Sequence, residues 1–158
     1  MKRRSLILSI LATGFFIAIA TLIPDLATAQ ADKVKTAMAD LKAKTEKLGA
    51  PKVEGKDLYF GTAKADNSVV DAVGGAATIF VKAGGEYLRV ATTLKKEDGS
   101  SAIGTTLDVK SAAIARLNNG EPYYGDATLF GKRYDAGYEP MKDASGAVIG
   151  AYFVGQPK

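Results

Sequence analysis

The stretch that most restricts the fold lies near the C-terminus, where Val148–Val154 reads VIGAYFV. Successive side chains of a strand point to opposite faces of its sheet, and both faces of this strand are apolar. A strand with two apolar faces belongs in the middle of a sheet, where both faces are covered. The sequence therefore predicts a sheet in which the last strand is central.

Four further strands are predicted from runs of β-forming residues between turn signals. They are Ala77–Lys82, Glu86–Leu94, Tyr123–Phe130 and Tyr134–Met141, with turns at Gly84-Gly85, at Gly131-Lys132 and at 143–146. Pairing the last strand with the first closes a five-strand antiparallel sheet and buries VIGAYFV. The predicted fold class is α+β, and its topology is similar to that of PAS-like domains.

A long helix is predicted over Gln30–Leu48, ended by Gly49 and Pro51. Its apolar stripe follows a 3.6-residue period and consists of Val34, Met38, Leu41, Thr45 and Leu48. A core helix explains this stripe. A helix that forms a homodimer is the alternative, because the stripe is close to heptad spacing.

Shorter elements are predicted between these parts of the chain. Leu58–Phe60 is a candidate short strand, and Asn67 is a candidate N-cap for a short helix over Ser68–Val73. Asp108 is the expected N-cap of a helix that crosses over to the last three strands.

Residues 1–29 have the pattern of a signal peptide. Lys2, Arg3 and Arg4 precede an apolar run over Leu6–Ile23, and Ala27-Thr28-Ala29 forms an A-x-A cleavage signature. An uncleaved membrane anchor is the alternative, although the run is slightly shorter than the roughly 20 residues of a spanning helix. The expected organisation is a signal peptide over 1–29, an N-terminal helix over 30–50 and one domain over 51–158, located in the periplasm.

Composition excludes several classes of function. Without residues 1–29 the chain loses three of its 21 basic and one of its 17 acidic residues, which leaves a net charge of about +2 and gives no support to nucleic-acid binding. The chain contains no cysteine and no histidine. This excludes Cys/His zinc sites, histidine-dependent nucleophiles and histidine-ligated haem. No cofactor, no metal site and no catalytic residues are expected.

Five short motifs carry a resemblance to a known family. They are LRV-x-T-x-LKKEDGS, GxxLD, PY-x-G-x-A-x-LFG, YEP-x-x-D-x-x-G and IG-x-x-FVG, and they extend over roughly Ala72 to Gly155. In combination they resemble the extracytoplasmic Cache domains of bacterial chemoreceptors and sensor kinases, of the type described as a fusion of two Cache families. The resemblance implies a PAS-like fold that binds small metabolites, often carboxylates or amino acids, on the membrane-distal side of the sheet.

The sequence departs from those receptors at its end. Their last strand leads into a second transmembrane helix and a cytoplasmic signalling module, whereas this chain ends at Lys158. The expectation is a free-standing periplasmic Cache domain whose bound form is detected by a membrane receptor or kinase.

The candidate ligand site starts from Glu86–Leu94. Strand alternation places Leu88, Val90 and Leu94 toward the core and Tyr87, Arg89, Ala91 and Thr93 on the other face. A guanidinium beside aromatic rings and a hydroxyl suits a small carboxylate. The expected ligand-binding residues are Arg89, Thr93, Lys95, Tyr124, Tyr134 and Tyr138.

Two interpretations of these residues remain open. In the first, Arg89 anchors a small organic acid and the protein is an exported sensory module. In the second, Arg89 pairs with Asp126, Asp135 or Glu139, and the tyrosines only pack. The protein would then be a structural or interaction protein with a degenerate Cache fold that dimerises or binds a partner through its N-terminal helix.

Overall fold

The computed structural model describes residues 26–158, so most of the predicted signal peptide over 1–29 lies outside the described residues. The helices and strands along the chain are α1 (Leu26–Leu48), β1 (Pro51–Glu54), β2 (Asp57–Phe60), β3 (Ala63–Lys64), α2 (Asn67–Val70), β4 (Ala76–Ala83), β5 (Glu86–Thr92), α3 (Ala112–Asn118), β6 (Tyr123–Leu129), β7 (Lys132–Lys142) and β8 (Val148–Pro157).

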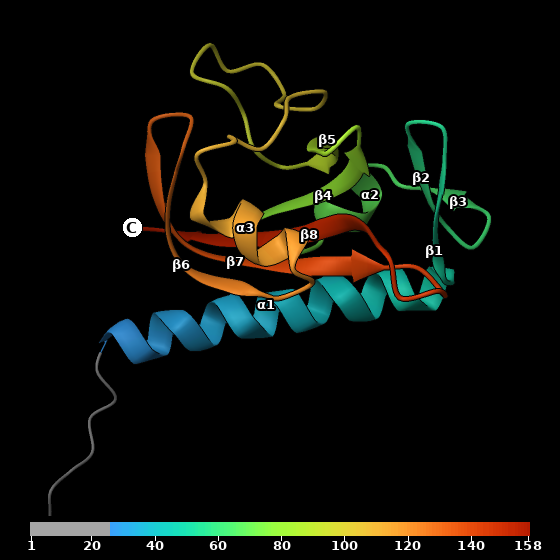
Figure 1. Cartoon of the computed structure of the whole chain (residues 1–158). Helices are drawn as coiled ribbons and strands as arrows, with labels where there is room; N and C mark the ends of the chain where they lie inside the picture. The colour runs from blue at the N-terminus through green and yellow to red at the C-terminus, as the bar shows by residue number, and fades with distance from the viewer. Residues whose placement is uncertain (1–25) are drawn as a thin grey trace, which may run out of the picture.

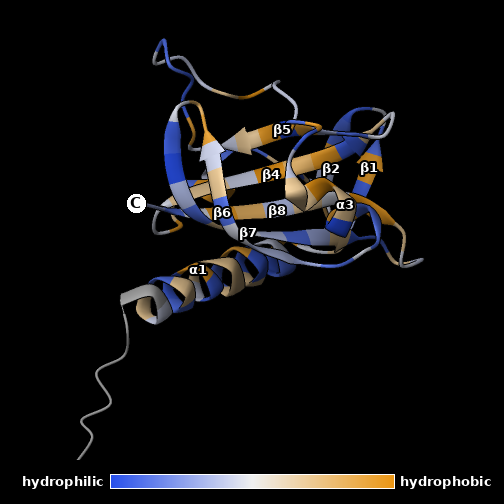
Figure 2. Ribbon diagram, turned by 60° about the vertical axis from the view of Figure 1, so that its left-hand side comes forward, coloured by the Kyte–Doolittle hydropathy of each residue, from blue (hydrophilic) through white to orange (hydrophobic). Residues whose placement is uncertain are grey.

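Five of the strands form one antiparallel sheet in the order β5-β4-β8-β7-β6. The last strand, β8, is its centre and pairs with β4, the first of the five, which confirms the predicted closure (Figure 1). Residues 150–155 of β8 are all buried, and hydrophobic residues follow β4 and β8 in Figure 2. The apolar character of VIGAYFV on both faces is therefore explained by its central position.

Helix α1 covers one face of this sheet. It begins at Leu26, four residues before the predicted start at Gln30. The side chains of Val34, Met38 and Leu41 are buried against the sheet. Thr45 is buried as well, and its hydroxyl lies 3.1 Å from the hydroxyl of Tyr152 on β8. The apolar stripe of α1, which was the candidate dimer interface, is thus packed against the rest of the same chain. Leu48 is the exception, with 44% of its surface exposed.

The segment between α1 and β4 contains more structure than predicted. Instead of one short strand, β1, β2 and β3 form a small antiparallel sheet. Leu58 and Phe60 of β2 are buried in the same core as α1. Helix α2 is shorter than predicted, and its N-cap is Asp66, whose carboxylate accepts from the backbone N–H of Ser68.

The other face of the sheet, called here the distal face, is covered by α3 and the long segment 93–111. Part of this segment lies along the free edge of β5, where Arg89 N donates to Thr105 O and Leu107 N donates to Tyr87 O. The N-cap of α3 is Ser111 rather than Asp108. Asp108 instead begins a turn before the helix, in which its carbonyl accepts from Ser111 N at 2.9 Å.

The predicted faces of the strand are wrong after Arg89, because a β-bulge in β5 reverses the side to which the following side chains point. The pairing of β4 with β5 shifts between Ile79 and Phe80, which leaves Val90 as the extra residue. As a result Ala91 packs in the α1 core and Leu94 in the distal core, the reverse of the predicted assignment. Residues before the bulge follow the prediction, with Leu88 facing the α1 core and Tyr87 the distal core.

The central pairing of β4 with β8 depends on a small residue at Gly150. A Cβ at this position would collide with the backbone carbonyl oxygen of Phe80 on β4. We expect Gly150→Ala to lower the free energy of unfolding by about 1–3 kcal/mol, measured by urea denaturation, because the two backbones must separate. Gly74→Ala is the control, since nothing lies within 4 Å of its added Cβ. Equal effects of the two substitutions would contradict this account of the sheet.

Candidate functional site

Arg89 lies on the distal face, on the edge strand β5. It comes from the middle of β5 and is 3% exposed. Its guanidinium lies between two aromatic rings, with Cζ 5.0 Å from the centroid of Phe80 and 5.3 Å from that of Phe130. Phe80 comes from β4, and Phe130 from the turn between β6 and β7. The two rings offer their π-faces to the cation and stabilise its charge in part.

Only one end of the guanidinium hydrogen-bonds within the described chain. Nη1 donates to Thr105 Oγ1 at 2.9 Å and to the carbonyl oxygen of Thr106 at 2.6 Å. Nε is buried and has no partner among residues 26–158. Nε–H and one N–H of Nη2 point along the same edge of the planar group, so this edge carries two parallel donors of the kind that pair with a carboxylate.

The carboxylates that could have neutralised Arg89 are bound elsewhere. Asp126 pairs with Arg133 at 3.0 Å and with Lys158 at 2.5 Å, and Asp135 pairs with Lys158 at 2.8 Å. Glu139 pairs with Lys42 of α1 at 2.7 Å. No ion pair joins Arg89 to any of the described residues.

Burial makes this arrangement costly. Loss of hydration lowers the pKa of Arg89, but a guanidinium remains protonated in proteins. A buried charge without a counter-charge costs several kcal/mol in a folded protein. The distal face therefore holds a permanent cation that has no carboxylate partner among the described residues.

Two tyrosines of β7 share this face with Arg89. Tyr134 is 7% and Tyr138 1% exposed, and both belong to the distal core, as strand alternation from Tyr134 predicts. The ring of Tyr138 packs on Phe153 with centroids 4.8 Å apart. Burial raises the pKa of Tyr138 and the nearby charge of Arg89 opposes this rise, so the phenol stays neutral and is able to donate. Tyr138 also lines a cavity of about 170 Å³ beneath α3.

Tyr124 does not join this group. It pairs with Gly137, and the ring of Tyr123 instead lies on the face of Tyr138, with centroids 6.1 Å apart. The reason is the length of the hairpin connection: two residues, Phe130-Gly131, separate the paired Leu129 and Lys132, whereas the predicted strands Tyr123–Phe130 and Tyr134–Met141 leave three residues between them. A shift of one residue turns every side chain of a strand to the opposite face.

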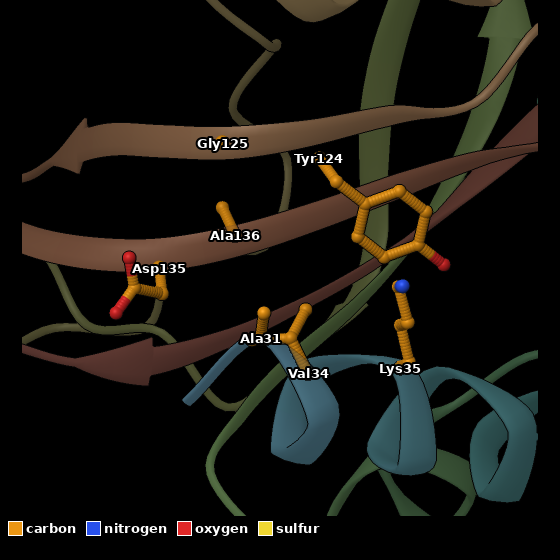
Figure 3. Close-up of a pocket in the computed structure, with 7 residues that line it drawn as sticks. All are labelled: Ala31, Val34, Lys35, Tyr124, Gly125, Asp135 and Ala136. Carbon is orange, nitrogen blue, oxygen red and sulfur yellow. The ribbon is translucent and has the colours of Figure 1, made fainter. Parts of the chain in front are cut away.

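Tyr124 faces α1 and lines a separate cavity of about 180 Å³ on that side of the sheet. Figure 3 shows its ring above Val34 and Ala31, with Lys35 pointing up toward the phenol. The remaining lining residues are Gly125, Asp135 and Ala136. Nothing in the sequence pattern indicated this cavity, because it forms only where α1 docks beside β6 and β7.

Thr93 and Lys95 lie at the margin of the distal face rather than beside the guanidinium. The Thr93 hydroxyl accepts from the backbone N–H of Ala77 at 2.9 Å, so β4 already occupies it. Both residues line a cavity of about 500 Å³, called here the basic cavity, together with Lys96, Phe130, Lys132 and Tyr134.

The sequence prediction missed four groups that contact Arg89 directly, namely Phe80, Thr105, Thr106 and Phe130. Phe80 could have been inferred from its place on the neighbouring strand. Thr105 and Phe130 come from a long segment and a turn, where local patterns give no direction for a side chain. Within residues 26–158 no group of three or more Asp or Glu side chains is placed to hold a metal ion.

A five-strand antiparallel sheet with an N-terminal helix packed on one face is consistent with a PAS-like fold. The model of the Cache 3/Cache 2 fusion domain family matches residues 25–158, and the chain belongs to this family. Cache domains are small-molecule-binding modules that are typically extracytoplasmic and typically not enzymes. No curated protein and no solved structure matches the chain. Among the described helices, none is sufficiently long and apolar to pass through a membrane.

The strand that carries Tyr138 also connects to α1 through the next residue. Glu139 accepts from Lys42 Nζ at 2.7 Å and from the Tyr124 hydroxyl at 2.6 Å. Burial by itself raises the pKa of this carboxyl group, but the two hydrogen bonds outweigh burial and the net pKa of Glu139 is lowered. The ionised form is therefore favoured by folding.

A lowered pKa predicts stability that is present at neutral pH and lost in acid. We expect wild type to exceed Glu139→Gln in unfolding free energy at pH 7, and this difference to shrink as pH falls below about 4.5, the usual pKa of glutamic acid. Urea denaturation between pH 7 and pH 3 measures it. Glu121→Gln, which removes an exposed pair with Arg116, is the control and should show little difference at any pH. A difference for Glu139→Gln that does not change with pH would contradict the assignment.

Proposed function

We propose that this protein is an exported sensory domain that binds a small carboxylate on its distal face, with Arg89 as the anchor of the carboxylate group. The observation that carries the proposal is the Arg89 guanidinium, which is 3% exposed, has an unpartnered Nε and pairs with no described carboxylate. Folding a cation into this position without a counter-charge is unfavourable, and a bound anion removes that cost.

The free edge of Arg89 matches the geometry of a carboxylate. Two parallel N–H donors, Nε and Nη2, reach the two oxygens of one carboxylate group, and such charge-assisted pairs are among the strongest hydrogen bonds in proteins. Nη1 is held by Thr105 and Thr106, which fixes the orientation of the fork before a ligand arrives. The phenol groups of Tyr134 and Tyr138 are the nearby donors that would orient the rest of the ligand.

The surroundings favour a carboxylate without a positive charge. Phe80, Phe130 and Tyr138 enclose the guanidinium with aromatic surface. The α-ammonium group of an amino acid needs a carboxylate or carbonyl partner, and Asp126 and Asp135 are occupied by Lys158. A small monocarboxylate with an apolar remainder is therefore the ligand class that fits best.

Export and a membrane partner complete the proposal. The sequence pattern of residues 1–29 supports targeting out of the cytoplasm, with a cleaved signal peptide favoured over an anchor. Helix α1 begins at Leu26, so cleavage after Ala29 would remove its first four residues and leave Gln30–Leu48. A membrane receptor or kinase is the partner class that would detect the ligand-bound form.

The interaction-protein alternative has less support. It relied on the apolar stripe of α1, and Val34, Met38 and Leu41 of this stripe are buried against the chain's own sheet. It also relied on an internal acidic partner for Arg89, and Asp126, Asp135 and Glu139 are each paired with another residue.

The test is a thermal-shift and calorimetric screen of the mature chain with acetate, propionate, pyruvate and benzoate. We expect at least one of these anions to raise Tm, and Arg89→Met to weaken its binding about 100-fold, because a bidentate charged pair is lost. Methionine fills the buried volume without a charge, so the variant should fold. Arg133→Met is the matched control, because Arg133 lies exposed at the start of β7, beside the hairpin turn.

Arg89→Lys separates charge from geometry. It keeps the positive charge but loses the planar fork, and it should bind much more weakly than wild type. If none of the four anions stabilises wild type, or if Arg89→Met binds as wild type does, the carboxylate proposal is wrong. A ligand-free interaction protein would then be the better description.

A further inference from the structure

Phe130 has an unusual backbone conformation. Among the described residues it is the only non-glycine residue with a positive φ, at 48°. It forms a two-residue turn with Gly131, whose φ is 74°, and the flanking residues Leu129 and Lys132 are paired. Such turns favour Asn-Gly, because the left-handed conformation is unfavourable for a bulky side chain. A phenylalanine here has to be held by the contacts of its ring.

The ring contacts the guanidinium on one side and a cavity on the other. Its centroid lies 5.3 Å from Cζ of Arg89, and its side chain also lines the basic cavity. Arg89 itself does not line that cavity and is 3% exposed. Phe130 therefore stands between the open volume and the buried cation.

The basic cavity is suited to collect anions. Lys95, Lys96 and Lys132 line it, and Glu97 is the acidic residue among its lining groups. A concave surface with an excess of positive charge raises the local concentration of anions. The volume of about 500 Å³ is ample for a small carboxylate.

We infer that Phe130 is the gate of the anion site: its ring covers the Arg89 guanidinium in the ligand-free protein, and it must swing away before an anion in the basic cavity reaches Nε and Nη2. The identity of the anion rests on the proposed function, but the gate does not. Opening breaks one cation–π contact, which is replaced by a stronger charge–charge contact when an anion arrives.

The gate is tested by chemical access to Arg89 in the absence of any ligand. Phenylglyoxal modifies accessible guanidinium groups, and peptide mass spectrometry of the full chain gives a separate rate for Arg89 and for the exposed Arg116. Phe130→Asn removes the ring and keeps a residue suited to the turn. We expect it to raise the rate at Arg89 at least tenfold and to leave the rate at Arg116 unchanged.

Two matched variants make the result specific. Phe130→Tyr keeps an aromatic cover, and Arg89 should react in it at nearly the wild-type rate. Leu41→Ala leaves a void in the α1 core, on the opposite face of the sheet from Arg89, so it reports how much modification comes from global unfolding. The inference is overturned if Phe130→Asn leaves the rate at Arg89 unchanged, if Phe130→Tyr is as reactive as Phe130→Asn, or if Leu41→Ala raises the rate equally.

The outcome is independent of the ligand screen. A tenfold rise at Arg89 supports the gate even if none of the four carboxylates binds, because the assay contains no carboxylate. Conversely, carboxylate binding that depends on Arg89 together with an unchanged modification rate in Phe130→Asn would keep the proposed function and remove the gate.

Discussion

The interaction on which the distal face depends is the burial of one guanidinium among aromatic rings without a counter-charge. The guanidinium of Arg89 lies over the rings of Phe80 and Phe130 and donates at one end to Thr105 and Thr106. These groups come from a neighbouring strand, a hairpin turn and a long connecting segment. Three separate parts of the chain are thus arranged around one charge, and Nε is left without a hydrogen-bond partner among the described residues. Such an arrangement is costly for packing alone, and the proposed anion binding relies on it.

The central strand β8 gives the domain two different faces. On one face α1 packs through Val34, Met38 and Leu41, and on the other lie Arg89 and the distal core. The two faces are linked within β7, where Tyr138 points to the distal core and the next residue, Glu139, is bound to Lys42 of α1. Tyr138 and Glu139 are adjacent residues whose side chains point to opposite faces, so one peptide bond separates the distal core from the α1 contact.

Local patterns predicted the larger elements because each depends on short-range periodicity. The strands from Ala76 onward, the central place of β8 and the long α1 all follow from repeats of two or 3.6 residues. The small sheet β1-β2-β3 has strands of two to four residues, which are too short for a period to show. The N-cap at Ser111 was missed because Asp108 has equal capping propensity, and only the turn between the two residues decides between them.

The sequence by itself determined that Arg89 lies on the face of Tyr87 and opposite Leu88, because strand alternation is a local property. It also determined, through the absence of histidine and cysteine, which chemistries are excluded. Tertiary structure decided which groups contact Arg89. The three carboxylates that the sequence offered as its partners instead form ion pairs with Lys42, Arg133 and Lys158. It also moved Tyr124 to the α1 side, because the number of residues in the hairpin connection sets which side chains of the two strands share a face, and no pattern within either strand specifies that number.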